Sequence, residues 1–137
     1  MPNINILELN EEELISIENG LAEYDKEYIT YKAEGKIHIG AFIDGELAGG
    51  VDACMTAFHI VYVSTFFIKE KFRRQGIGKT LILEMEKRAK NLGANTIRLD
   101  TFDWQGREFY LEMGYEEVGS YTCEEDMFSE YFFRKEI

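Results

Sequence analysis

Apolar residues in the first thirty positions predict a short strand followed by a helix. A brief apolar run at residues 4–7 is typical of a strand. Asn10 and Glu13 then have the spacing of a capping box, in which each side chain accepts a hydrogen bond from the other residue's backbone N–H. Because Asn19 and Gly20 interrupt the stripe that follows, this segment forms either one helix or two helices with a kink. The stripe has apolar residues at steps of three and four, namely Leu14, Ile17, Leu21, Tyr24 and Tyr28.

The middle of the chain has the pattern of a hairpin and a further strand. Apolar runs at residues 37–43 and 47–55 flank Asp44 and Gly45. Asp-Gly between two such runs predicts a β-hairpin, because both turn residues adopt positive φ angles. Residues 58–68 are rich in β-branched and aromatic side chains, and they predict a buried central strand.

The second half of the chain predicts two helices that alternate with strands. After a basic loop at residues 69–78, a helix follows to Leu92, and Gly93 ends it. The remaining elements are a strand at 96–101, a short helix at 104–113, and strands at 115–121 and 131–135. This order, β-α-β-β-β-α-β-α-β-β, predicts a mixed sheet with helices on its faces, within one domain that spans residues 1–137.

Composition narrows the range of partners. The 137 residues include 26 Asp and Glu against 15 Lys and Arg, a net charge of −11. Such an acidic chain repels nucleic acid and anionic membranes, and it favours cationic partners. Two cysteines show neither metal-ligand spacing nor a disulfide framework. We find no signal-peptide pattern and no apolar run of the ~20 residues that a membrane helix needs. We therefore expect a soluble cytoplasmic protein without a metal.

The loop at residues 69–79 concentrates positive charge on this acidic chain, with five Lys and Arg side chains against Glu70 alone. It lies between a predicted strand and a predicted helix. Backbone N–H groups at a helix start have no intrahelical partner, and they can bind phosphate. Glycines allow the backbone to approach a ligand closely. The loop therefore predicts a polyanion site, and the alternative is a basic turn exposed to solvent.

Two nucleotide-binding motifs match this loop incompletely. Residues 78–80 match the end of the pattern G-x-x-x-x-G-K-[ST], but Arg73 replaces its first glycine. Gly76 and Gly78 match the start of G-x-G-x-x-G/A, but Leu81 stands where a small residue must allow the helix to pack on the strand. A P-loop and a dinucleotide fingerprint are therefore the weaker interpretations.

A third interpretation covers more of the chain. Residues 66–93 resemble motif A of the GNAT superfamily of N-acetyltransferases, whose pattern Q/R-x-x-G-x-G/A is matched by Arg73, Gly76 and Gly78. Residues 109–115, FYLEMGY, resemble the family's F-Y-x-x-x-G-F/Y signature, on the short helix where the family has it. The resemblance implies a mixed α/β fold with a central, mostly antiparallel sheet flanked by helices on both faces.

The resemblance implies an enzyme, an N-acetyltransferase that passes the acetyl group of acetyl-CoA to a primary amine of a small cationic acceptor. Direct attack in a ternary complex is expected, because neither Cys54 nor Cys123 has an activating neighbour in the sequence. In the family the loop binds the pyrophosphate, and the bulged strand before it pairs with the pantetheine arm and offers N–H groups to the oxyanion. The implied cofactor-binding residues are Phe66, Phe67, Ile68, Arg73, Arg74, Gln75, Gly76, Ile77, Gly78, Lys79, Thr80 and Asp103.

The resemblance also implies a catalytic residue, Tyr110, which would give a proton to the departing CoA thiolate. The general base stays open, because residues 58–68 lack the carboxylate that the family often has there. The candidates are water and the side chains of His59, Asp52, Asp100 and Asp103. The missing carboxylate also keeps an alternative function open, a catalytically degenerate CoA-binding sensor or partner-binding module.

The acceptor itself is not defined by the sequence. Aromatic rings attract ammonium groups, so Trp104, Tyr24, Tyr28 and Tyr31 are candidates for the walls of an acceptor cleft. Carboxylates at residues 23–27 would attract the same cation. The resemblance also allows a homodimer.

Overall fold

The computed structural model describes residues 2–137, and the chain divides into two compact units, Met1–Thr30 and Tyr31–Ile137. The first unit contains one helix, α1 (Glu11–Asp25). The predicted capping box is confirmed, because the Asn10 side chain accepts from the Glu13 N–H at 2.8 Å and Glu13 accepts from the Asn10 N–H at 3.1 Å. Since α1 is continuous, a single helix is the correct alternative.

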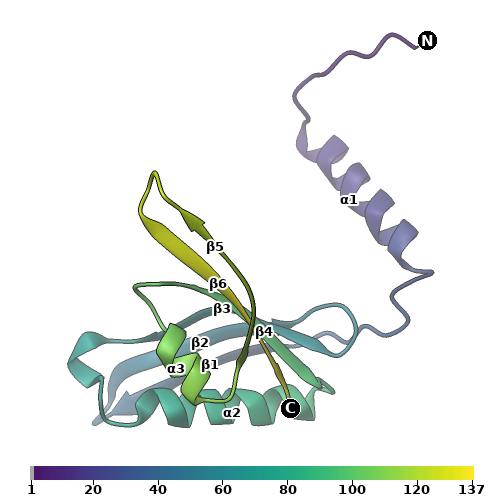
Figure 1. The fold of residues 1–137 in the computed structure, drawn as a ribbon. Helices are drawn as coiled ribbons and strands as arrows, with labels where there is room; N and C mark the ends of the chain where they lie inside the picture. The colour runs from purple at the N-terminus through teal and green to yellow at the C-terminus, as the bar shows by residue number, and fades with distance from the viewer. Residues whose placement is uncertain (1) are drawn as a thin grey trace. The chain divides into compact units, whose positions relative to one another are not determined.

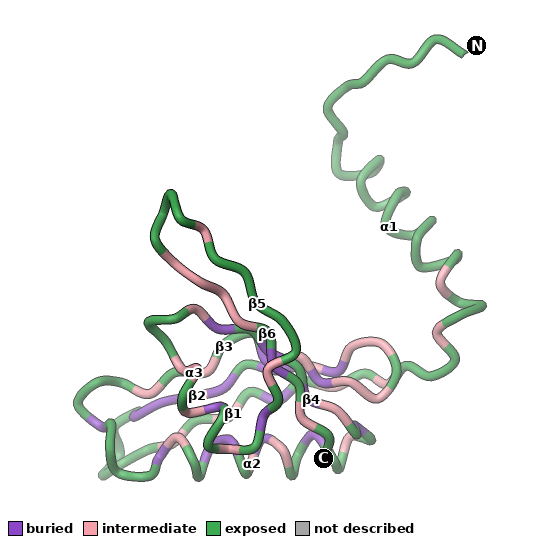
Figure 2. The backbone as a smooth tube through the Cα atoms, in the orientation of Figure 1, coloured by how far each residue is buried: buried purple, intermediate pink, exposed green. Residues whose placement is uncertain are grey.

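The predicted first strand at residues 4–7 is wrong. Residues 2–10 have no regular secondary structure, and no strand of the described chain pairs with them. A strand needs a neighbour for its backbone N–H and C=O groups, so an apolar run without such a neighbour stays irregular. No residue of α1 is buried either, and Figure 2 shows this segment almost entirely in the colour of exposed residues.

The second unit is built on a six-stranded sheet of order β1-β2-β3-β4-β6-β5. Every neighbouring pair is antiparallel except β3 and β4, which are parallel, so the predicted mixed, mostly antiparallel sheet is confirmed. Figure 1 shows α2 lying along this sheet. The strands are β1 (Lys36–Ile43), β2 (Glu46–Met55), β3 (Ile60–Ile68), β4 (Thr96–Phe102), β5 (Glu116–Cys123) and β6 (Phe128–Glu136), and the helices are α2 (Ile77–Asn91) and α3 (Arg107–Glu112).

The turn of the β1–β2 hairpin lies at the two residues where the sequence predicted it. Asp44 has a φ of 50° and Gly45 a φ of 81°, as this tight turn requires. The hairpin prediction is confirmed, and it fixes β1 as the outer strand on that side of the sheet.

The hydrophobic core lies between the sheet and the two helices of the second unit. Helix α2 packs against β1, β2 and β3, and α3 joins the same core through Tyr110, whose ring contacts Phe133 of β6. On β3 Val61 and Val63 are buried and Ser64 is exposed, so the predicted buried strand is buried only in part. Helices were expected on both faces of the sheet. Helices α2 and α3 cover the core face, and α1 belongs to the first unit.

The parallel strands β3 and β4 are joined along only part of their length. Paired residues run from Ile60 and Thr96 to Tyr62 and Arg98, and no later pair links the two strands in the described chain. From Val63 onward β3 therefore keeps β2 as its only strand neighbour. We call the place where β3 and β4 part, just after Tyr62 and Arg98, the β3–β4 fork.

A bulge marks the fork. Thr65 pairs with Asp52 and Val63 with Ala53, so Ser64 is the extra residue, and its hydroxyl donates to the Asp52 carbonyl at 3.1 Å. The strand is therefore bulged, as the resemblance implied, and its extra residue lies two positions before Phe66. A bulge increases the twist of its strand, and β3 parts from β4 at the same place in the chain.

Candidate functional site

The loop between β3 and α2 presents backbone N–H groups to an open space. Arg74 and Gly76 both adopt left-handed conformations, with φ angles of 64° and 79°. The first helical hydrogen bond runs from the Thr80 N–H to the Gly76 carbonyl at 3.1 Å, so the preceding N–H groups have no intrahelical partner. Alternating left-handed and right-handed residues gather such groups into an anion-binding concavity.

The two glycines of the loop serve different purposes. A Cβ on Gly76 would meet nothing within 4 Å, so this glycine is required for its positive φ, and the space over it is open to a ligand. A Cβ on Gly78 would lie 3.3 Å from the ring of Phe109. Gly78 therefore allows α3 to approach the first turn of α2, which brings the two sequence motifs together.

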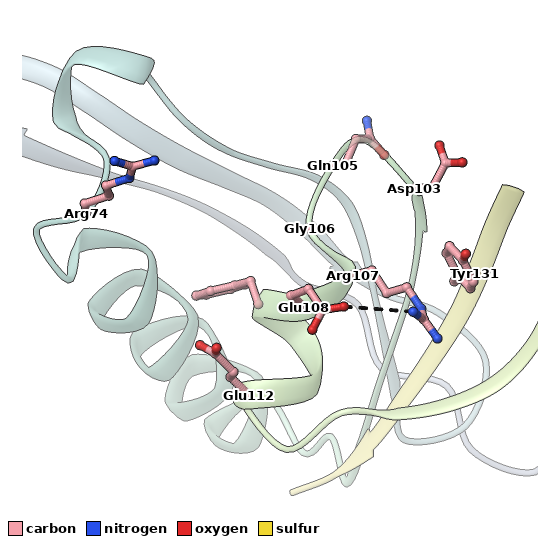
Figure 3. A pocket seen from close by; sticks show the side chains of 9 residues that line it. Arg74, Asp103, Gln105, Gly106, Arg107, Glu108, Glu112 and Tyr131 are labelled. Atoms are coloured by element: carbon pink, nitrogen blue, oxygen red, sulfur yellow. Dashed lines mark ion pairs between the residues drawn. The ribbon is translucent and has the colours of Figure 1, made fainter. Parts of the chain in front are cut away.

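The two arginines of the loop also differ. Arg73 donates from Nε to the Ile68 carbonyl at 2.8 Å, and its guanidinium lies 5.3 Å from the ring centroid of Phe67. Arg73 therefore fastens the loop to the end of β3. Arg74 points instead to a cavity between the loop and α3 (Figure 3). A role of both side chains in phosphate binding stays a prediction.

The cavity has a volume of about 830 Å³, within the range of small-molecule sites. Figure 3 shows Arg74 on one side of it and the turn before α3 on the other. The cavity is lined by Arg74, Asp103, Gln105, Gly106, Arg107, Glu108, Phe109, Glu112 and Tyr131.

Several of these residues were missed by sequence reasoning, and Arg107 is the most informative. Its Nε donates to Glu117 at 2.8 Å, and its guanidinium lies 4.3 Å from the ring centroid of Tyr131. An arginine at the first position of a helix opposes the helix dipole, so it indicates a partner elsewhere in the fold. This signal depends on the true start of α3 at Arg107, and a helix that begins at residue 104, as the sequence predicted, does not contain it.

The turn before α3 is held by side-chain hydrogen bonds. Gln105 accepts from the Phe102 N–H at 2.8 Å, and the buried hydroxyl of Thr101 accepts from the Gly106 N–H at 3.1 Å. This turn replaces the first residues of the helix predicted at 104–113, which begins instead at Arg107. Polar contacts, and not helix propensity, therefore determine the conformation of the turn that forms this wall of the cavity.

Asp103 belongs to the same turn. Its carboxylate accepts from the Ser129 N–H at 3.1 Å, and its own N–H donates to the Ser129 carbonyl at 3.1 Å. Asp103 thus ties the turn to the start of β6 while it lines the cavity. Its contact with acetyl-CoA stays a prediction.

The end of β3 uses its side chains for packing. The Phe66 ring lies 5.5 Å from the ring of Phe109 and 6.2 Å from that of Tyr110, between centroids, and Ile68 also packs against the core. Phe67 is exposed and lies next to Arg73. What this segment offers a ligand is the backbone edge beyond the fork.

Tyr110 lies in the core with only 6% of its surface exposed. Its hydroxyl makes no hydrogen bond within the described residues, and no fully buried side-chain N or O atom there lacks a partner, so the hydroxyl retains contact with solvent. Burial, together with the negative charge of Asp100, raises the pKa of Tyr110 to about 12. The hydroxyl is therefore protonated at neutral pH and can donate a hydrogen bond.

Two of the candidate bases are engaged in other contacts. His59 lies directly before β3, at the end away from the loop. Its Nδ1 is 3.0 Å from the Gly93 carbonyl oxygen, and its ring stacks on that of Tyr31 with 3.8 Å between centroids. Asp52 lies on β2, and its carboxylate is 2.9 Å from Nε2 of His38 on β1. The same stacking places Tyr31 beside His59.

Asp100 lies two residues after Arg98, the last residue of β4 that pairs with β3, at the β3–β4 fork. It accepts a hydrogen bond of 3.0 Å from the hydroxyl of Tyr62 on β3. Among the four side chains considered as bases, Asp100 is the one whose charge acts on Tyr110.

Other kinds of site are not found among residues 2–137. No group of three or more His, Cys, Asp and Glu side chains is arranged to hold a metal ion there. In the same span, none of the helices has the length and apolar character needed to cross a bilayer.

Residues 4–115 match the acetyltransferase (GNAT) family, a span that covers most of the chain and reaches into both units. The chain therefore belongs to the acetyltransferase (GNAT) family, as the glycine loop and the FYLEMGY segment predicted.

Relatives support this membership. Over 82 residues the chain is 33% identical to "Uncharacterized N-acetyltransferase YvbK" of Bacillus subtilis (strain 168), a match that covers 59% of this chain and 52% of YvbK. The chain thus spans about half the length of that relative.

Solved structures share the fold. The crystal structure of an acetyltransferase from Bacillus cereus ATCC 14579 has a TM-score of 0.89 at 27% identity and covers 98% of both chains. The PaiA N-acetyltransferase from Thermoplasma acidophilum, crystallised in complex with coenzyme A, has a TM-score of 0.64 at 24% identity. That comparison covers 94% of this chain and 80% of the other, and it is a likeness of fold.

Proposed function

We propose that this protein is an acetyl-CoA-dependent N-acetyltransferase that acts on a primary amine of a small cationic acceptor. The observation that carries the proposal is a convergence. The anion-binding loop directly follows the free backbone edge of β3, and the Tyr110 ring lies 6.2 Å from that of Phe66 on this same stretch of strand, between centroids. Family membership supports this function, and residues 1–137 act as one domain in the proposal.

The donor would lie along the loop and the β3 edge. The left-handed Gly76 and the free N–H groups around it suit a pyrophosphate, and Arg74 adds a positive charge beside the cavity. The backbone of Phe66 to Ile68 suits the amide groups of pantetheine, which would pair with β3 as an added strand. The Ile68 carbonyl already accepts a hydrogen bond from Arg73. The N–H groups of this edge would therefore make more of the hydrogen bonds to pantetheine than its carbonyl groups.

The reaction is a direct transfer in the ternary complex. The amine nitrogen attacks the thioester carbonyl, an N–C bond forms, and the C–S bond breaks. Backbone N–H groups near the Ser64 bulge stabilise the carbonyl oxygen, and the Tyr110 hydroxyl donates to the departing sulfur. With a pKa of about 12, Tyr110 keeps its proton until the thiolate forms.

A cationic acceptor fits the charge of the molecule. The chain carries a net charge of −11, while the basic residues of the loop serve the donor. An acidic surface raises the local concentration of amines, which are positively charged at neutral pH. The roles expected of Tyr24 and Tyr28 on the acceptor side, and the homodimer, stay predictions.

Titration calorimetry with acetyl-CoA tests the donor site. Gly76→Glu places a carboxylate over the loop and strains its positive φ, so we expect at least tenfold weaker binding. The matched control is Gly45→Glu, since Gly45 also has a positive φ of 81° with open space around its Cβ but lies in the β1–β2 turn. Equal binding by both variants would contradict the proposed donor site.

Thiol release from acetyl-CoA tests the transfer. We expect release that depends on an added amine from a panel of 1,4-diaminobutane, lysine amide and benzylamine. Tyr110→Phe should lower kcat by roughly 10- to 100-fold, because the thiolate loses its hydrogen-bond donor. Binding of acetyl-CoA without transfer to any amine would favour a CoA-binding sensor instead, for which the absence of a carboxylate on β3 is the supporting observation.

A further inference from the structure

Asp100 has a setting that no other carboxylate of the site shares. It projects from β4 on the sheet face opposite the core, two residues beyond the last residue that pairs with β3. The Tyr62 hydroxyl donates to one of its oxygens at 3.0 Å. That contact joins the two strands across the fork just where their backbone pairing ends.

The fork also brings Asp100 near the proposed leaving-group site. The Tyr110 ring packs against Phe66 of β3 and Phe133 of β6 on the core side of the sheet. Asp100 lies on the opposite, exposed face of β4. The two groups are close enough for the carboxylate charge to contribute to the raised pKa of the Tyr110 hydroxyl. A thioester held along the β3 edge would therefore lie between them, with its sulfur toward Tyr110 and its open face toward Asp100.

The surroundings of Asp100 suit a positively charged group. Phe132 of β6 is its partner in the β4–β6 ladder, and the neighbouring Glu130 accepts a hydrogen bond from Tyr121 of β5. The aromatic surface continues through Phe102, which stacks on the exposed Trp104 at 4.7 Å. Carboxylates bordered by aromatic rings attract ammonium groups by charge and by cation–π interaction.

One basic side chain lies on the same face. The guanidinium of Arg98 stacks on the Tyr62 ring, 4.3 Å from its centroid, and no ion pair joins it to Asp100 in the described chain. The charged and titratable side chains that face Asp100 are thus Tyr62 of β3, Arg98 of β4, Tyr121 of β5, Glu130 of β6 and Tyr110 of α3. The free oxygen of Asp100 remains available to a ligand.

We propose that Asp100, held by the Tyr62 hydroxyl at the β3–β4 fork, binds the acceptor amine and takes its proton. This assignment rests on the proposed acetyl transfer and names its missing base. One N–H of the neutral amine donates to Asp100, which aims the nitrogen lone pair at the carbonyl carbon. As the N–C bond forms, the nitrogen becomes positive, and its proton passes to Asp100 and then to solvent. The C–S bond breaks, and the sulfur takes the electron pair beside Tyr110.

The test compares variants with the same change of charge. Asp100→Asn keeps an oxygen that can accept from Tyr62 but cannot take a proton, so kcat/KM for the best amine of the panel should fall at least about 100-fold. The control is Asp126→Asn in the β5–β6 turn, which should stay within threefold of the unchanged protein. The dissociation constant for acetyl-CoA and the midpoint of thermal unfolding should be the same in all three proteins.

Tyr62→Phe separates positioning from catalysis. Removing this hydroxyl leaves the Asp100 charge in place but frees its rotation, so the amine KM should rise while the acetyl-CoA constant stays unchanged. Asp100→Glu, which retains a proton acceptor, should recover part of the activity lost in Asp100→Asn.

The outcomes separate the two proposals. Amine acetylation by Asp100→Asn at the rate of Asp126→Asn would overturn the role of Asp100 and leave the transferase function standing. If the unchanged protein binds acetyl-CoA but acetylates no amine, the transferase function fails and the assignment of Asp100 fails with it.

Discussion

Tyr110 has its ring in the hydrophobic core and its hydroxyl in contact with solvent. Its sequence position predicted a functional tyrosine, and the alternative was packing on an amphipathic helix. The structure adds the burial and the charge that raise its pKa. Neither could be predicted, because Asp100 lies on a strand ten residues earlier in the chain, and its approach to Tyr110 depends on the fork.

The raised pKa of Tyr110 predicts a pH dependence of stability. The folded value of about 12 exceeds the unfolded value of about 10, so this stabilisation is complete below pH 10 and is lost as the pH rises through 12. Between pH 9 and 11 the unfolding free energy of the unchanged protein should fall by roughly 1 kcal/mol more than that of Tyr110→Phe. Urea unfolding at pH 9, 10 and 11 measures this difference.

Tyr115 provides a check on this prediction. Its pKa is also raised, by burial and by Glu86, so it contributes the same alkaline loss to both proteins. Parallel curves for the unchanged protein and Tyr110→Phe would contradict the raised pKa of Tyr110.

At the scale of elements, local signals decided which predictions succeeded. The β1–β2 hairpin and α2 are specified by residues within them, the Asp44-Gly45 turn and the apolar stripe that ends before Gly93. The strand at residues 4–7 failed because pairing depends on a distant neighbour. The Ser64 bulge and the start of α3 were misplaced for the same reason, since contacts with Asp52 and Thr101 set them.

Close contact between β2 and β3 predicts that Gly49 is sensitive to substitution. A Cβ on Gly49 would lie 2.7 Å from the Phe67 carbonyl oxygen and 2.6 Å from Cδ1 of Ile68. Gly49→Ala should lower the unfolding free energy by about 3 kcal/mol and should weaken acetyl-CoA binding, because the end of β3 must move. Urea unfolding and calorimetry measure the two effects.

Gly119→Ala on β5 is the matched control for Gly49→Ala. There a Cβ would meet Phe132 at 3.7 Å, an ordinary contact, so the change should stay within about 0.5 kcal/mol. Similar losses in the two variants would show that crowding at β3 is not the cause.

At the scale of the whole second unit, one polar cluster fastens several elements together. Glu86 of α2 accepts from the Tyr115 hydroxyl at 2.8 Å and from Lys135 of β6 at 3.1 Å, and Lys135 also donates to the Met113 carbonyl at 2.9 Å. The Glu86 side chain is 12% exposed and that of Lys135 is 23% exposed. The cluster therefore holds the end of α3 and the start of β5 against α2.

Removing Glu86 should cost more than removing a neighbouring surface carboxylate. Glu86→Ala leaves the Lys135 ammonium poorly solvated, and the unfolding free energy should fall by about 3 kcal/mol. Glu84→Ala breaks an exposed pair with Arg88 on the same helix and should cost less than about 1 kcal/mol. Thermal or urea unfolding compares them, and equal losses would mean that the Glu86 cluster is as weak as a surface pair.

The β3–β4 fork has a consequence for aggregation. An unpaired strand edge at the margin of a sheet can recruit a strand from another protein, and proteins protect such edges with charges, prolines or covering loops. Here the unpaired edge of β3 lies inside the sheet, with β2 on one side and β4 close by on the other. The outer margins of the sheet, where a strand of another protein could add, are formed by β1 and β5 instead. The edge that we propose for the donor is thus set apart from the edges that are open to aggregation.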